Sequence, residues 1–244
     1  MNFVTCELTG RLGNQCFIIA ACITTAMKNN ADFLIPRNVI TNDELYIKHL
    51  LAFDESQHQI QHVHVDNEFK FVPIRYKPNM MLRGYYQALE HTDGYLQCAI
   101  NFMQFKYQFS QDVVGIHIRR GDYVQLNIKH PWDPSYYFKA IKFFTDKGFK
   151  DFQVFSDDIA WCKEFFSEIE HANFYYSENN SAVQDLELLS GCEHMICAAS
   201  TFSVWAGYLN KNTDAIITRP SFFMGGADAR LYRNVYKKNW IEIR

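Results

Sequence analysis

Residues 115 to 123 read Gly-Ile-His-Ile-Arg-Arg-Gly-Asp-Tyr and carry the residue types best suited to chemistry in this chain. Arg119 and Arg120 place two permanently charged, forked donors side by side, which suits a diphosphate. His117 lies two positions before Arg119, and strand side chains alternate between faces. We therefore expect the imidazole and the first guanidinium on one face of a strand, next to a bound anion.

The residues just before this segment predict the element that positions it. Val113, Val114, Ile116 and Ile118 form a β-branched apolar run, which is typical of a buried parallel strand. Ligands of open α/β sheets sit beyond the carboxyl ends of such strands. Two simpler interpretations compete. Residues 120 to 122 are also an Arg-Gly-Asp adhesion tripeptide, and an arginine and an aspartate here could merely close a loop.

Three further segments are predicted to reach the same sheet edge. Ser-Asp-Asp at 156–158 follows a strand, Asp185 lies near the start of a helix, and Ser-Thr-Phe-Ser at 200–203 opens another helix. Helix N-termini and hydroxyls hold phosphate oxygens, and a carboxylate can accept the N1–H and amino group of guanine. Taken singly, each segment is also an ordinary helix start. Their joint order favours a nucleotide site.

Composition restricts the class of protein. The chain has 244 residues, a formal charge of −3 and 48% hydrophobic residues, which predicts a globular protein and excludes a strongly basic nucleic-acid binder or an acidic disordered chain. Its seven cysteines, an odd number at irregular spacing, favour a reducing compartment over a disulfide scaffold. No signal peptide or transmembrane anchor is visible, so we expect a cytoplasmic or cytosol-facing location without stable membrane insertion.

Strands and helices alternate on both sides of residue 110. In the first half we predict strands at 3–8, 31–36, 59–65 and 69–72, and helices at 15–28, 43–52 and 85–105. In the second half we predict strands at 113–118, 152–155, 195–198 and 214–217, and helices at 134–147, 159–168, 182–191 and from 200 to 210, before an irregular aromatic tail. The alternation predicts two α/β domains, residues 1–110 and 111–244.

Several motifs together resemble a known family. They are Gly10-Arg11-Leu12-Gly13-Asn14-Gln15, His117-Ile118-Arg119-Arg120-Gly121-Asp122-Tyr123, the run at 130–141, Ser156-Asp157-Asp158, Asp185 followed by Thr201-Phe202-Ser203-Val204-Trp205, and the segment at 239–243. This set is similar to the α-1,2-fucosyltransferases of glycosyltransferase family 11. The resemblance is dense at 4–20 and 112–210 and thin at 30–105. The chain is shorter than usual for the family, and Cys16 stands where methionine is common.

The resemblance implies a GT-B-like α/β fold, with two facing Rossmann-type domains and the active site in the cleft. Residues 1–110 would be the acceptor-side domain, and residues 111–244 would bind GDP-fucose. The implied reaction moves L-fucose from GDP-β-L-fucose, with inversion, to the 2-hydroxyl of a glycan acceptor, usually terminal β-galactose. Two alternatives stay open: a GDP-sugar transferase of different linkage or acceptor, such as a protein O-fucosyltransferase, and an inactive GDP-sugar-binding module.

The resemblance also assigns roles to single residues. Arg119 would support the leaving diphosphate, with Arg120 assisting or holding the loop. The remaining residues fall into three groups: Asp122 beside the arginines as a catalytic candidate; His117, Asp157, Asp158, Asp185, Thr201, Phe202 and Ser203 around the donor; and Arg11 and Asn14 on the acceptor side. Glu7 and Asp122 are both candidates for the general base, and the sequence does not choose between them.

No metal and no cofactor are expected, because the chain lacks an Asp-x-Asp motif. Two groups contain metal-ligating residue types: the histidines at 58, 62 and 64, and Cys-x-His-x-x-Cys at 192–197. Neither offers four ligands at a familiar zinc spacing. The expected partners are GDP-fucose and a galactose-terminated glycan, with no nucleic acid. The sequence specifies neither the acceptor nor an oligomeric state.

Overall fold

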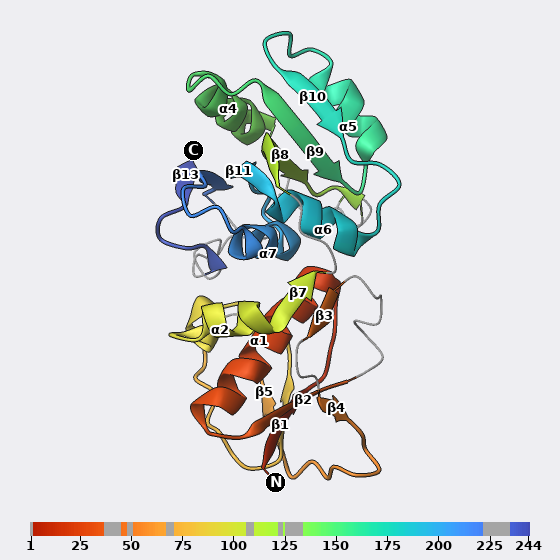
Figure 1. Ribbon diagram of the computed structural model, residues 1–244, viewed down its shortest axis with the longest axis vertical. Helices are drawn as coiled ribbons and strands as arrows, with labels where there is room; N and C mark the ends of the chain where they lie inside the picture. Colours follow the sequence, from red (N-terminus) through yellow and green to blue (C-terminus); the bar gives the residue numbers. More distant parts are fainter. Residues whose placement is uncertain are drawn as a thin grey trace. The chain divides into compact units, whose positions relative to one another are not determined.

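The computed structural model describes residues 2–36, 45–47, 51–66, 71–105, 110–121, 124, 134–221 and 235–244. The chain divides into two compact units, Met1–Lys106 and Tyr107–Arg244. The sequence placed this division at 110/111, a few residues later. Figure 1 shows that each unit contains strands and helices of its own.

The N-terminal unit is built on a five-stranded parallel sheet. Its strands lie in the order β4 (Leu51–Phe53), β2 (Asp32–Pro36), β1 (Phe3–Cys6), β6 (Met80–Arg83) and β5 (His62–Val65). Helix α1 (Leu12–Lys28) covers one face (Figure 1) and buries an almost continuous apolar run against β1 and β2. Because β1 is buried on both faces, it reads as an apolar run and not as an alternation.

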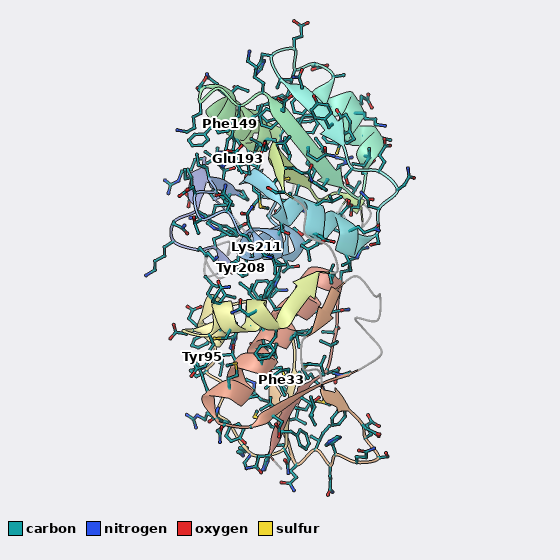
Figure 2. All side chains as sticks on the ribbon, viewed as in Figure 1. Phe33, Tyr95, Phe149, Glu193, Tyr208 and Lys211 are labelled. Carbon is teal, nitrogen blue, oxygen red and sulfur yellow. The ribbon has the colours of Figure 1, made fainter. Side chains whose placement is uncertain are left out.

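Shorter elements complete this unit. They are a 3-10 turn η1 (Leu89–Thr92), helix α2 (Leu96–Phe102) and an antiparallel pair, β3 (Leu45–Ile47) with β7 (Met103–Phe105). Phe33 of β2, labelled in Figure 2, packs edge-on against Phe102 of α2, with 5.0 Å between the ring centroids. This contact ties α2 to the sheet.

The C-terminal unit contains a six-stranded parallel sheet. Its strands lie in the order β10 (Asn173–Tyr176), β9 (Asp151–Ser156), β8 (Gln111–Ile118), β11 (Cys192–Ile196), β12 (Ile217–Pro220) and β13 (Ile241–Ile243). The helices described in this unit are α4 (Pro134–Thr145), α5 (Ile159–Phe166), α6 (Ala182–Ser190) and α7 (Thr201–Leu209). The chain after each inner strand therefore emerges at one shared edge, as the sequence predicted.

The prediction of a helix at 43–52 is wrong for the residues of this segment that the structure describes. Residues 45–47 form β3 and residues 51–53 form β4. The short apolar run there suits either element, and pairing with β7 and β2 selects the strand. The helix predicted at 85–105 is broken into η1, α2 and β7.

Besides β3, β4 and β7, three further strands were missed, namely β6, β10 and β13, and β12 begins three residues later than predicted. The tail predicted to be irregular is ordered at its end, where β13 pairs with β12. Trp240 fills the space over Gly207, since a Cβ there would lie 2.6 Å from the indole. Of the strand predicted at 69–72, the first two residues lie outside the described chain, and Phe71 and Val72 are not in a strand. Within the described residues, no helix is long and apolar enough to cross a membrane.

Candidate functional site

The central strand β8 fixes the position of the motif at 115–121. It lies between β9 and β11, and Val114, Ile116 and Ile118 are fully buried. Gly115 lets helix α6 approach the strand, because a Cβ there would lie 2.7 Å from the side chain of Leu189. The residues that follow Ile118 therefore emerge at the carboxyl edge of a rigid sheet.

Two aspartates after β9 hold both arginines. The Asp157 carboxylate accepts a hydrogen bond from Nη1 of Arg119. Its Oδ1 also accepts from the backbone N–H of Arg120 at 2.9 Å and of Gly121 at 3.1 Å. Nε of Arg120 donates to Oδ2 of Asp158 at 3.1 Å. We call Arg119, Arg120, Asp157 and Asp158 the arginine site.

Within the arginine site the two arginines are less exposed than the two aspartates, whose side chains are 26% and 37% exposed. The side chains of Arg119 and Arg120 are only 13% and 16% exposed. Two cations and two carboxylates balance in charge, which offsets the cost of burying them. The guanidinium of Arg120 also lies over the ring of Trp161, 3.9 Å from its centroid. Both arginines are thus held in fixed positions by side chains of the protein itself.

Two local contacts hold Asp157 and Asp158 in place beside the arginines. Asp158 caps helix α5 by accepting from the N–H of Trp161 at 3.3 Å. Asp157 packs so closely on Gly121 that a Cβ there would collide with its carboxylate. The Ser-Asp-Asp segment was predicted to contact a donor ligand. Within the described chain its carboxylates contact the arginines and cap α5, so it positions the cations, and a contact with the donor stays a prediction.

His117 is buried directly beside the arginines. Burial, and secondarily the charge of Arg119, lower the pKa of His117 to about 3, so the imidazole is neutral at physiological pH. Its ring stacks on Phe202 of α7, with 4.9 Å between the centroids. Nδ1 is buried and has no hydrogen-bond partner in the described part of the chain. A neutral imidazole in this position offers one donor and one acceptor nitrogen.

The first turn of α7 brings Thr201, Phe202 and Ser203 to the same sheet edge. Thr201 and Phe202 are partly exposed, whereas Ser203 is fully buried. The hydroxyl of Ser203 accepts from the backbone N–H of Ala198 at 2.9 Å and so closes the turn between β11 and α7. The structure thus gives Ser203 a structural contact, while the N–H groups of this first turn suit an anion.

Asp185 lies in the first turn of α6, close to the end of β10. Its Oδ1 accepts from Ser177 Oγ at 2.7 Å and from Asn180 Nδ2 at 3.3 Å. Burial raises the pKa of Asp185, and these two hydrogen bonds oppose that rise. These contacts hold the carboxylate at the end of β10 and do not join it to His117. Its predicted role at guanine or ribose stays a prediction.

The acceptor-side candidates belong to the N-terminal unit. Gly10 has a φ of +73° and starts the turn into α1. Arg11 is exposed, and Asn14 is half-buried and accepts a hydrogen bond from Nε2 of Gln87 at 3.0 Å. Glu7 forms an ion pair with Arg83 at 2.7 Å, so this candidate base has a structural partner. The other candidate base, Asp122, lies outside the described residues.

Two site residues were missed by sequence reasoning. Trp161 supports Arg120 from helix α5, and Gln87 fixes Asn14 from a segment 73 residues away. The tryptophan follows Asp158 by three positions, a spacing that is visible but equally typical of core packing. Nothing in the sequence pairs Gln87 with Asn14.

The described residues offer no ligand set for a metal ion. The described chain holds no cluster of three or more histidine, cysteine, aspartate or glutamate side chains arranged for an ion. In the Cys-x-His-x-x-Cys segment, Nδ1 of His194 accepts from the backbone N–H of Ile216 at 3.1 Å. Phe149, labelled in Figure 2, packs edge-on against the same imidazole at 4.5 Å. His194 therefore has a structural environment.

Comparison with known proteins identifies the family of this chain. The family model of glycosyl transferase family 11 matches residues 2–244. An O-antigen biosynthesis glycosyltransferase, WbnK of Escherichia coli, is 33% identical over 144 residues, covering 54% of this chain and 45% of the relative. An alpha-1,2-colitosyltransferase of Escherichia coli is 39% identical over 113 residues, covering 43% and 38%. The chain thus spans less than half the length of these two relatives.

A mammalian relative matches over a longer stretch at lower identity. Galactoside 2-alpha-L-fucosyltransferase Sec1 of Mus musculus is 26% identical over 236 residues, covering 84% of this chain and 64% of the relative. The alignment therefore includes both units of the chain.

Solved structures share the fold. NodZ alpha-1,6-fucosyltransferase, soaked with GDP-fucose, has a TM-score of 0.55 at 12% identity and covers 85% of this chain and 92% of its own. POFUT1 in complex with GDP-fucose has a TM-score of 0.53 at 10% identity, covering 88% and 96%. The α/β, GT-B-like fold class inferred from the sequence is confirmed. With a family match over nearly every residue, the chain belongs to glycosyltransferase family 11.

Proposed function

We propose that this protein transfers L-fucose from GDP-β-L-fucose to the 2-hydroxyl of a terminal β-galactose, with inversion at the anomeric carbon and without a metal ion. The part of this proposal that concerns binding of the GDP-fucose donor rests on one observation. Arg119 and Arg120 lie at the carboxyl end of the central strand β8 and are held there by Asp157 and Asp158. The name of one relative, galactoside 2-alpha-L-fucosyltransferase Sec1, supports fucose as the transferred sugar and a galactoside as the acceptor.

The chemistry of the reaction explains why held arginines matter. When the bond between the anomeric carbon and the β-phosphate oxygen breaks, negative charge builds up on the diphosphate and positive charge on the sugar. Cations already fixed in place stabilise that state more than the ground state, since they need no reorganisation. Arg119 is assigned to the leaving diphosphate, and Arg120 to the loop and its neighbouring oxygens.

The neutral His117 and the first turn of α7 complete the donor site in this proposal. His117 can exchange hydrogen bonds with guanine or ribose because its imidazole keeps an unpartnered Nδ1 within the described chain. Phe202 stacks on that imidazole and holds its plane. The N–H groups at the start of α7 would contact phosphate oxygens.

The test is GDP release from GDP-fucose, measured with and without lactose or N-acetyllactosamine, in EDTA. We expect release that the disaccharide stimulates, and an α-1,2 linkage by NMR of the product. Binding of GDP without release would instead support an inactive GDP-sugar-binding module. Absence of both binding and release would refute the proposal.

A second candidate differs in the sugar that is transferred. The relative named as an alpha-1,2-colitosyltransferase is 39% identical over its aligned residues. A colitose donor should therefore be compared with GDP-fucose under the same conditions. Faster turnover of colitose would keep the site assignment and change the donor sugar. A product of another linkage would favour a transferase of the protein O-fucosyltransferase kind.

A further inference from the structure

We infer that Gln87 binds a hydroxyl group of the sugar acceptor, and that Asn14 and the turn at 84–88 position its amide for this contact. The inference rests on the proposed function and concerns its acceptor half. We call Asn14 and Gln87 the amide site. Both residues are half-buried, and both lie just beyond the carboxyl ends of strands in the N-terminal sheet, β1 and β6 respectively.

The side chain of Gln87 is oriented by one specific contact. Its Nε2 donates to Oδ1 of Asn14 at 3.0 Å. In this pair Nε2 of Gln87 is the donor and Oδ1 of Asn14 is the acceptor, so Oε1 of Gln87 lies at the end of the amide that does not contact Asn14. Among the described residues, no group donates to Oε1 of Gln87. The result is a fixed carbonyl acceptor in a half-buried position, which suits the O–H of a sugar.

The backbone that carries Gln87 is held in an unfavourable conformation. Tyr86, the preceding residue, has a φ of +53°, which is rare for a side chain of this size. The N–H of Ala88 donates to the carbonyl of Tyr86 at 2.9 Å, so Gln87 occupies the centre of a three-residue turn. A residue such as Tyr86 keeps a strained φ only where surrounding contacts impose it, and such residues cluster at functional sites.

Buried polar contacts impose this turn. The N–H of Tyr86 donates to Oδ2 of Asp66 at 2.8 Å, and its hydroxyl donates to the carbonyl of His64 at 2.9 Å. Asp66 also lies 3.5 Å from Nε2 of the buried His91. Gly84, with a φ of +115°, packs so closely on Asp66 that a Cβ would lie 2.6 Å from it. Five residues thus fix one partly exposed glutamine.

The other half of the amide site is equally constrained. Gly10 has a positive φ, and a Cβ on it would collide with the amide of Asn14. Asn14 can therefore lie against the turn only because residue 10 is glycine. Two turns from distant parts of the sequence, one at a glycine and one at the strained Tyr86, place two neutral amides together. An amide oxygen can orient an acceptor hydroxyl for attack but cannot remove its proton.

The test compares two glutamines that make the same kind of contact. Gln97 also donates from Nε2 to an asparagine oxygen, that of Asn101, at 3.0 Å, but it lies on the exposed surface of α2. We expect Gln87→Ala to lower kcat/KM for the acceptor by about ten- to a hundredfold, mainly through KM. Gln97→Ala should leave it unchanged. GDP affinity and acceptor-independent hydrolysis of GDP-fucose should change less than about twofold in both variants.

Three outcomes separate the possible failures. If the wild-type protein transfers sugar and Gln87→Ala transfers it equally well, this inference is wrong while the proposed function stands. If Gln87→Ala weakens GDP binding as much as acceptor use, the residue has a structural role and the inference is also wrong. If the alanine variant fails to fold, Gln87→Met preserves the side-chain length without the amide, and the same acceptor-specific loss is expected.

Discussion

The arginine site and the amide site occur at equivalent positions of two similar sheets, yet they use opposite chemistry. The arginine site follows β8 and β9 in the C-terminal unit and contains four charged groups of which the arginines are largely buried. The amide site follows β1 and β6 in the N-terminal unit and contains two neutral side chains. Both sites lie at the ends of parallel strands, but the first has the charges that suit a charged leaving group and the second has the neutral amides that suit uncharged hydroxyls.

The two sites also differ in how they are held rigid. Carboxylates neutralise the cations of the arginine site, and Asp157 fixes the backbone of residues 120 and 121 as well. Backbone strain and buried polar contacts hold the amide site instead. Buried charges require counter-charges, whereas a neutral amide requires hydrogen-bond partners and no counter-charge.

The largest expected effect is at Arg119. We expect Arg119→Ala to lower transfer by about 100- to 1000-fold, because removing one fixed donor to a developing negative charge costs roughly 3–4 kcal/mol. Turnover should be measured at saturating donor and acceptor. The matched control is Arg244→Ala, which removes an arginine that is 82% exposed and also paired with a carboxylate. Wild-type turnover in Arg119→Ala would remove this residue from the site.

Asp157 should matter next, because it positions Arg119 and contacts no ligand in our assignment. We expect Asp157→Asn to lower kcat by about ten- to a hundredfold and to reduce the free energy of unfolding by about 1–3 kcal/mol. The control, Asp146→Asn, breaks an exposed ion pair with Lys142 and should change both by little. If Asp157→Asn weakened only GDP binding and left kcat intact, the positioning role would be wrong.

His117, which is buried beside the arginine site, makes the stability of the C-terminal unit depend on pH. Because burial lowers the pKa of His117 to about 3, the folded state binds fewer protons than the unfolded state. This contribution to stability is present above the unfolded pKa near 6.5 and is lost as pH falls toward 3. Between pH 6.5 and 4.5, the wild type should lose about 2 kcal/mol more than His117→Gln. Urea unfolding at both pH values measures this, and parallel losses would contradict it.

The smallest expected effect is that of metal removal. If the arginines supply the positive charge for the leaving group, EDTA should leave transfer unchanged within experimental error. The measurement is the initial rate of GDP release before and after dialysis against EDTA, followed by addition of Mg²⁺ or Mn²⁺. Loss of activity on chelation, restored by a cation, would contradict the metal-free mechanism.

The sequence predicted the arginine site far better than the amide site. The apolar run around Ile116 predicts a buried strand, and the two arginines follow it directly. The sequence also predicted that Asp157 and Asp158 lie at the same sheet edge, because they follow a predicted strand and precede a predicted helix. The sequence did not reveal that these carboxylates bind the arginines. That contact depends on β8 and β9 lying side by side, which pairs residues nearly 40 positions apart.

The secondary structure of the N-terminal unit was harder to predict from the sequence because its strands are short. The three-residue strands β3 and β4 lie in a segment predicted to be a helix, and β6 was missed. Strands this short carry too few residues to show a period, so their neighbours in the sheet decide them. The segment that holds Gln87 follows β6 directly, and it was predicted to be mostly helical.

By itself, the sequence determined the α/β class, the family resemblance and the strand end that carries the two arginines. Those features depend on local apolar periodicity and on motifs within a few residues of one another. Only the tertiary structure decided that Asp157 clamps Arg119, that burial keeps His117 neutral, and that Gln87 meets Asn14. These features depend on burial and on contacts across strands distant in sequence, which no local pattern encodes.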